Sequence, residues 1–194
     1  FGPTIAPQRI EDTINFLFEK GSDGFLAYSE GAFDEINKTI AAGLASCQFE
    51  NAYDVLEAYA ERYLGGDTQG WREWLCQMGD INQLNTETAR SDFTRLASSS
   101  RQSWRLQVLE EKLKMCEASA IVKNHNRWTQ ARITAAEDFW TAKETLWRNI
   151  WNLGLGRAIL QFDRDGIIPE WHKEYRQLSN QGIKTRSQIL PDEA

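Results

Sequence analysis

Apolar residues recur every three or four positions through the first third of the chain, which is the spacing of amphipathic helices. A first helix is predicted over Gln8–Lys20, and Gly21 would stop it. Its apolar face comprises Ile10, Ile14, Leu17 and Phe18. The same spacing continues over Phe33–Leu44 and again over Phe49–Tyr63. These two stretches form either one helix or two helices with a break near Ser46–Asn51.

The middle of the chain predicts further helices. Thr68 can cap a short helix that Gly79 closes, with Trp71, Trp74, Leu75 and Met78 as its apolar residues. From Asp80 to Leu153 there are 74 residues without glycine or proline, which as one helix would span roughly 110 Å. We expect breaks instead at Ser98–Ser100, Lys123–Asn126 or both, because Ser and Asn compete with helical hydrogen bonds.

These elements predict an all-α fold, an elongated bundle of long antiparallel amphipathic helices with extended arms at both ends. The bundle would cover residues 8–178. The N-terminal arm would be residues 1–7, and the polar residues 179–194 would form the C-terminal arm. The pattern leaves open whether the long middle stretch is one rod or a folded hairpin.

A tryptophan strip lies in the segment Ala135–Leu155. At 100° per residue, Trp140, Trp147 and Trp151 fall within about 40° of one another, beside a second apolar strip. That second strip comprises Phe139, Leu146, Ile150 and Leu153. The apolar arc is therefore wider than one neighbouring helix covers. The tryptophan strip is either core against a second helix or an interface with a partner, which tryptophan favours.

Two other tryptophans have arginine neighbours. Trp104 lies next to Arg105, and Trp128 next to Arg127, an arrangement that intrahelical cation–π contacts explain more simply than base stacking does. The predicted interface residues are Trp140, Trp147, Trp151, Trp104 and Trp128.

Charge is distributed unevenly along a chain whose net charge is −6. Residues 1–100 carry 7 basic and 16 acidic side chains, whereas residues 101–150 carry 9 basic and 6 acidic ones. Opposite charge in the two parts suits packing of one part on the other, within a chain or between copies, although both can also be ordinary solvated faces. The acidic total argues against nucleic acid as the main partner.

The cysteines, the histidines and the missing motifs limit the kinds of site that the sequence predicts. Three cysteines without a CxxC spacing predict neither a zinc site nor a disulfide framework, and favour free buried thiols in a reducing compartment. No apolar run reaches the roughly 18 residues that span a bilayer. Two histidines without metal spacing, and the absence of catalytic motifs, predict no metal site, no cofactor and no enzyme.

The favoured function is that of a non-catalytic structural or assembly subunit. It would associate with copies of itself, or pack into a larger protein assembly, through the helix that bears the tryptophan strip. The alternative is a helical protein that coats an apolar lipid or polymer surface, or holds a hydrophobic ligand between its helices. A third hypothesis is an enzyme without a recognisable motif.

Overall fold

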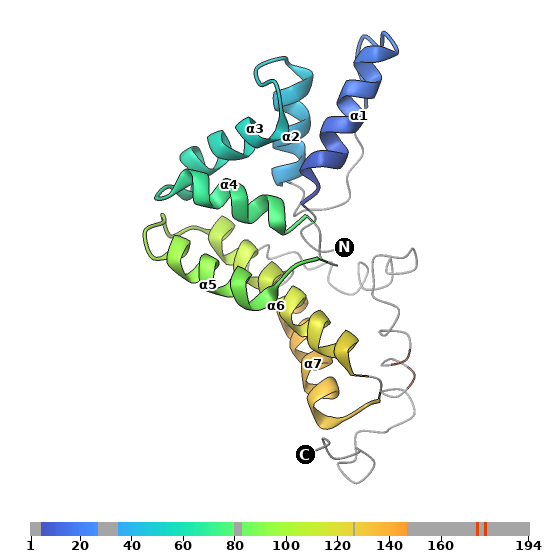
Figure 1. Cartoon of the computed structure of the whole chain (residues 1–194), viewed down its shortest axis with the longest axis vertical. Coiled ribbons are helices and arrows are strands. Elements are labelled where there is room, and N and C mark those ends of the chain that lie inside the picture. The colour runs from blue at the N-terminus through green and yellow to red at the C-terminus, as the bar shows by residue number, and fades with distance from the viewer. Residues whose placement is uncertain are drawn as a thin grey trace. The chain divides into compact units, whose positions relative to one another are not determined.

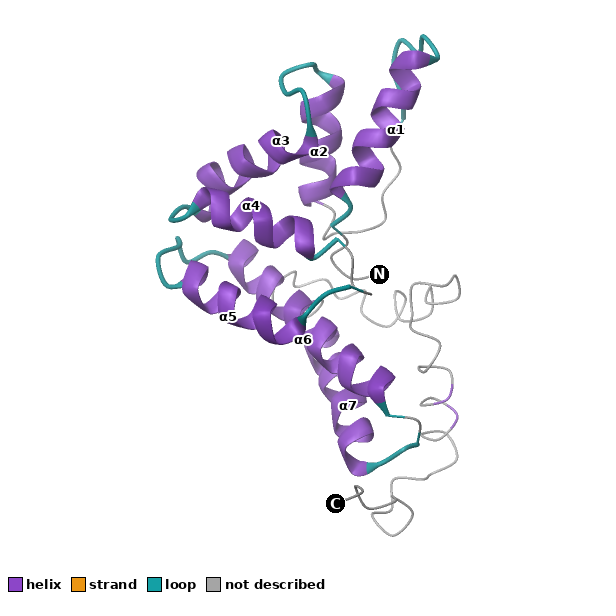
Figure 2. Cartoon of the chain, viewed as in Figure 1, coloured by secondary structure: helices purple, strands orange, loops and turns teal. Residues whose placement is uncertain are grey.

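The structure is a computed structural model, and it describes residues 5–26, 35–79, 83–125 and 127–146, together with 174 and 177. Every regular element named within these residues is a helix (Figures 1 and 2), so the all-α prediction is confirmed. The elements are α1 (Pro7–Glu19), α2 (Glu35–Ala45), α3 (Ala52–Tyr59), η1 (Ala60–Leu64), α4 (Thr68–Gln77), α5 (Thr86–Ala97), α6 (Trp104–Asn124) and α7 (Gln130–Thr145).

The chain divides into two compact units, residues 2–110 and residues 111–194. The division falls within α6, so that helix contributes residues to both units. Most of both predicted arms lies outside the described residues. The elongated bundle with its extended arms therefore stays a prediction.

Both helix breaks predicted in the middle of the chain are confirmed, between α5 and α6 and between α6 and α7, at the Ser- and Asn-containing stretches. Of the two alternatives left open near Ser46–Asn51, the structure shows two helices, α2 and α3. Asn51 and Asn85 cap α3 and α5, since their side chains accept hydrogen bonds from the N–H groups of Asp54 and Thr88, each at 3.0 Å.

The predicted cap of the fourth helix is wrong by one residue. Thr68 is the first residue of α4, and Asp67 caps it by accepting from the Gly70 N–H at 2.8 Å. Aspartate also carries a charge, which suits the positive end of a helix better than a hydroxyl does. That hydrogen bond and the neighbouring Arg95 hold the pKa of the Asp67 carboxyl below its usual range.

Within residues 2–110, helices that follow one another pack together: α1 on α2, α2 on α3, α3 on α4 and α4 on α5. The core of α4 and α5 is aromatic, because Trp71, Trp74 and Phe93 lie buried with ring centroids 5.4–5.7 Å apart. Both indole N–H groups are satisfied: Trp71 donates to the Ser100 hydroxyl at 2.8 Å and Trp74 to the Ala89 carbonyl at 2.9 Å.

In residues 111–194, the structure describes the rest of α6, most of a short connection, α7 and Leu146, together with residues 174 and 177. Thr129 caps α7, with its hydroxyl accepting from the Arg132 N–H at 3.2 Å. Several buried residues of α6 and α7 are charged, namely Glu111, Lys112, Arg132 and Lys143. Burial lowers the pKa of the Lys112 ammonium, because the charged form loses its hydration.

Candidate protein-interaction surface

A pocket forms where α1 ends and the chain turns back. Gly21 has φ +68°, which glycine adopts without strain, and its N–H donates to the Phe18 carbonyl at 2.9 Å. The Ser22 N–H donates to the Leu17 carbonyl at 3.0 Å, so the two bonds close a Schellman motif. This turn directs residues 22–25 back along the side of α1.

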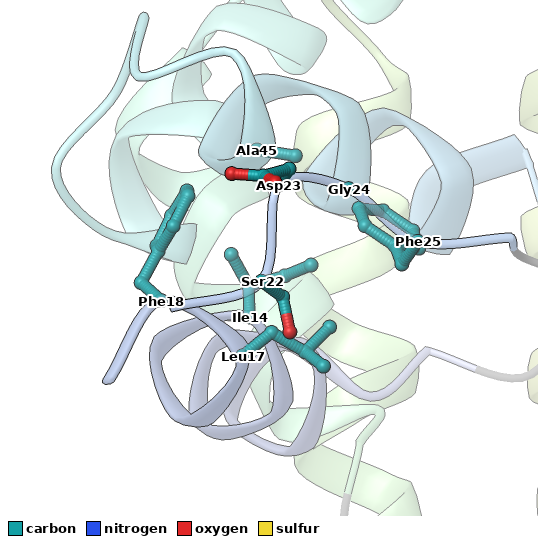
Figure 3. A pocket seen from close by; sticks show the side chains of 8 residues that line it. All are labelled: Ile14, Leu17, Phe18, Ser22, Asp23, Gly24, Phe25 and Ala45. Carbon is teal, nitrogen blue, oxygen red and sulfur yellow. The ribbon is translucent and has the colours of Figure 1, made fainter. Parts of the chain in front are cut away.

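The resulting α1-end pocket has a volume of about 250 Å³. It is lined by Ile14, Leu17, Phe18, Ser22, Asp23, Gly24, Phe25 and Ala45. Figure 3 shows Phe18 and Phe25 on opposite sides of the view, with Ile14 and Leu17 between them. The walls therefore come from α1, from the returning segment and from the end of α2.

Two phenylalanines of the pocket lining are about half exposed. Phe18 is 48% exposed and Phe25 is 45% exposed, whereas Phe16, which is 54% exposed, does not line the pocket. Burying one such side chain stabilises a protein by roughly 1.5–3 kcal/mol, so a group of them left in solvent indicates a surface that something covers. We name Phe18, Phe25 and the α1-end pocket together the phenylalanine surface.

The segment that forms most of the pocket is acidic. Residues 9–26 hold four carboxylates and two cations, and the Asp23 carboxylate is part of the pocket lining. One of the two cations, Lys20, places its ammonium 5.3 Å from the centre of the Phe16 ring. A partner that is apolar and cationic is therefore favoured over one that is apolar and acidic.

Polar contacts fix α1 to its neighbours. The Glu11 carboxylate accepts from the Ala52 N–H at the start of α3 at 2.6 Å, and the Ala6 N–H donates to the Asn37 side chain of α2 at 3.0 Å. Ile14, on the same helix, is buried. The pocket is thus built on a positioned helix, which lowers the entropy that a partner must overcome on binding.

A second surface lies where η1 meets the start of α6. The Arg105 guanidinium lies between two rings, 4.1 Å from the centre of Tyr63 and 4.4 Å from that of Trp104. Its Nε donates to both oxygens of Glu35, at 2.9 and 3.0 Å, and Nη2 also contacts that carboxylate. This fork geometry fixes the guanidinium plane, and with it the ring that stacks on it.

Tyr59 completes that polar cluster from α3. Its hydroxyl donates to the Glu35 carboxylate at 3.2 Å. Burial, and then the negative charge of Glu35, raise the pKa of the Tyr59 phenol above its ordinary value. Both effects favour the neutral phenol, which keeps its hydrogen bond to Glu35 throughout the physiological pH range.

Two further arginines lie close to Tyr63 and the residues before α6. Arg101 packs over Gly65, and its Nη1 donates to the Arg62 carbonyl at 2.7 Å. The Arg62 and Arg101 side chains are exposed, and Trp104 itself is 40% exposed. We name Arg62, Tyr63, Arg101, Trp104 and Arg105 the arginine–tryptophan surface.

The five tryptophans of the predicted interface lie in different environments. Trp104 is the most exposed of those described, whereas Trp128 and Trp140 are half-buried. The Arg132 guanidinium stacks on Trp128 at 4.1 Å, and the Lys143 ammonium lies 4.7 Å from the centre of the Trp140 ring. Trp147 and Trp151 lie outside the described residues, so the tryptophan strip stays a prediction.

Sequence reasoning missed the phenylalanine surface. Phe18 was predicted on the buried face of the first helix and is instead half exposed, while Phe25 was not singled out. The available sequence signal was Gly21, the glycine that stops the first helix a few residues before Phe25.

The cysteines differ from the buried thiols expected. Cys116 is buried and Cys76 is half-buried, but Cys47 is exposed at the end of α2, with φ +56°. Burial raises the pKa of both the Cys76 and Cys116 thiols, which makes them poor nucleophiles. Among the residues that the structure describes, no group of His, Cys, Asp and Glu side chains is arranged to hold a metal ion.

Comparison of the chain with protein-family models, with curated proteins and with solved structures gave no match. Within the described parts of the chain, no helix combines the length and apolar character needed to cross a bilayer.

Proposed function

We propose that this protein is a non-catalytic assembly subunit that binds other protein chains, including copies of itself, through the phenylalanine surface. Two phenylalanines, Phe18 and Phe25, support this function, because each is about half exposed and both line one cavity. Aromatic residues are enriched at protein interfaces because they bury a large rigid area at low entropic cost. The hydrogen bonds that hold α1 to α2 and α3 add to that advantage, because they fix the pocket before a partner binds.

The size of the pocket favours a protein partner over a small ligand. Sites for small molecules usually enclose about 300–1,000 Å³ and bury most of the ligand. The α1-end pocket is smaller, at about 250 Å³, and its aromatic rim extends outside the cavity. One side chain inserted into the pocket, with neighbouring residues covering the rim, matches this shape.

Two finer parts of the proposal rest on sequence patterns. The strip of Trp140, Trp147 and Trp151 would supply a further contact within the assembly. The elongated bundle, with an extended arm at residues 1–7 and a polar arm at residues 179–194, would let the arms of one subunit contact its neighbours. Both add to the interface without being needed for the contact at the phenylalanine surface.

The direct test is the substitution Phe18→Asp, read by light scattering coupled to size-exclusion chromatography. A carboxylate at the pocket wall should weaken self-association at least about tenfold, because a charge must be desolvated where a ring was buried. Tyr53→Asp is the matched control. Tyr53 is an aromatic residue that is 50% exposed on α3, and it does not line the pocket.

The two variants separate the outcomes. Phe18→Asp should stay helical by circular dichroism and run at a lower molar mass than the parent chain, while Tyr53→Asp should behave like the parent. If Phe18→Asp and Tyr53→Asp both assemble as the parent does, the phenylalanine surface is not the interface.

A further inference from the structure

We propose that the α1-end pocket of one copy takes Trp104 of a second copy, so that the arginine–tryptophan surface is the other half of the contact. This inference rests on the proposed function, since it names the partner of the same pocket. It predicts a head-to-tail contact, in which each copy offers a different surface to each of its two neighbours.

Trp104 is exposed and held in one orientation, as a side chain that inserts into a partner's pocket would be. It begins α6, it is 40% exposed, and the Arg105 guanidinium stacked at 4.4 Å orients its ring. Arg105 is itself fixed by its fork on Glu35. An indole held in this way loses little freedom on binding, which is the property of residues that dominate interface energies.

The charges around Trp104 complement those of the pocket. The exposed arginines Arg62 and Arg101 belong to the same surface, and η1 adds one exposed carboxylate, Glu61. The pocket offers the Asp23 carboxylate in its lining and an excess of acidic groups along residues 9–26. An arginine pair facing such a rim would select this orientation of two copies over a contact between two acidic pockets.

Size and chemistry of the cavity agree with this occupant. Its volume of about 250 Å³ matches one aromatic side chain rather than a helix. Phe18 and Phe25 on its two sides offer ring faces and edges to an indole (Figure 3). Tryptophan and arginine are two of the three residue types most enriched in interface hot spots.

A complementation experiment tests the head-to-tail contact. The Phe18→Asp variant keeps an intact Trp104, and the Trp104→Ala variant keeps an intact pocket. Each alone should lose at least about tenfold in self-affinity. Mixed in equal amounts they should form a complex with the mass of two chains, since one productive contact remains available between them.

A charge exchange gives a second route that does not depend on Trp104→Ala folding. Asp23 and Arg62 are both exposed, so substituting either leaves the core intact. Asp23→Lys alone and Arg62→Glu alone should each weaken association, and the double variant should regain part of the loss because the attraction is restored with reversed sign.

The outcomes are distinguishable from failure of the proposed function. If the parent chain stays monomeric, self-association and the head-to-tail contact are both wrong. A parent chain that associates, with Trp104→Ala associating equally well, overturns only the head-to-tail contact. A mixture of Phe18→Asp and Trp104→Ala that yields no dimer also overturns the head-to-tail contact. The same holds if a single-stranded oligonucleotide binds the parent but not Trp104→Ala, while the parent and Trp104→Ala self-associate equally.

Discussion

Arg105 is the residue on which the arginine–tryptophan surface is built. Its guanidinium links α6 to Glu35 of α2 by the forked hydrogen bonds, and it stacks on Tyr63 of η1. A half-buried charge pair of this kind contributes geometry more than stability, because desolvation offsets much of the attraction. Its effect is to hold Trp104 in one orientation.

Tyr59 makes this cluster sensitive to alkaline pH. Because the pKa of the folded phenol is raised by burial and then by Glu35, its contribution to stability is fully present below the unfolded pKa of about 10. Above that pH the unfolded chain releases the proton and the folded chain retains it. Stability should therefore fall by up to about 1.4 kcal/mol for each further pH unit.

The Tyr59→Phe variant isolates this effect. It loses the hydrogen bond to Glu35, at a cost of about 0.5–1.5 kcal/mol at neutral pH, and should then show a shallower loss of stability above pH ~10. Urea unfolding as a function of pH measures both quantities. The control is Tyr53→Phe, on the same helix, which should keep the steeper loss. Equal alkaline slopes in Tyr59→Phe and the parent would contradict the assignment.

At the scale of elements, helix ends decide where the surfaces fall. The Schellman turn at Gly21 returns the chain over α1, and the π-helical turn η1 closes with the Gly65 N–H donating to the Ala60 carbonyl at 2.8 Å. The first turn makes the pocket. The second places Arg62 and Tyr63 beside the start of α6.

Gly70 lies at a close contact between α4 and α5. A Cβ there would lie 2.3 Å from an oxygen of the Asp67 cap and 2.7 Å from a methyl carbon of Leu96. Alanine is favoured over glycine in a helix by about 1 kcal/mol, yet we expect Gly70→Ala to destabilise the fold by about 1–3 kcal/mol, because the clash outweighs propensity. Thermal unfolding measures the difference.

The control for this substitution is Gly24→Ala. Gly24 has no atom within 4 Å of an added Cβ, and its backbone needs no positive φ. The change should leave stability within about 0.5 kcal/mol of the parent. A Gly70→Ala variant as stable as the parent would show that α4 and α5 have room to separate.

The helices themselves followed from the sequence. The three- and four-residue spacing fixed the extent of α1 to within a residue at each end, and the polar stretches predicted the breaks that separate α5, α6 and α7. Local signals decide these features, because caps and periodicity depend on neighbours along the chain. The cap at Asp67 was missed because Asp67 and Thr68 are both good capping residues.

The candidate site depended on contacts that a single sequence does not display. Ala45 and Phe25 are twenty residues apart and meet only because α2 packs on α1. Likewise, Glu35 and Arg105 are separated by 70 residues. Periodicity ranked Phe18 as core because it lies beside Ile14 on the helix, whereas burial is decided by how far the neighbouring helices extend.

For the whole molecule, the uneven charge along the chain has a definite consequence. In the proposed contact, the acidic segment around the pocket of one copy would attract the cationic arginine–tryptophan surface of another, whereas like surfaces would repel. Association should therefore weaken as salt is raised from about 0.05 M to about 0.5 M, while its aromatic part persists. Association that is unchanged or stronger in high salt would indicate an apolar contact alone.

The most direct measurement is sedimentation equilibrium of the unmodified chain across a dilution series. Self-association through the phenylalanine surface predicts a mass-average molar mass that rises with concentration, above that of one chain. A mass that stays at one chain up to the highest soluble concentration would contradict the self-association on which the assembly function depends.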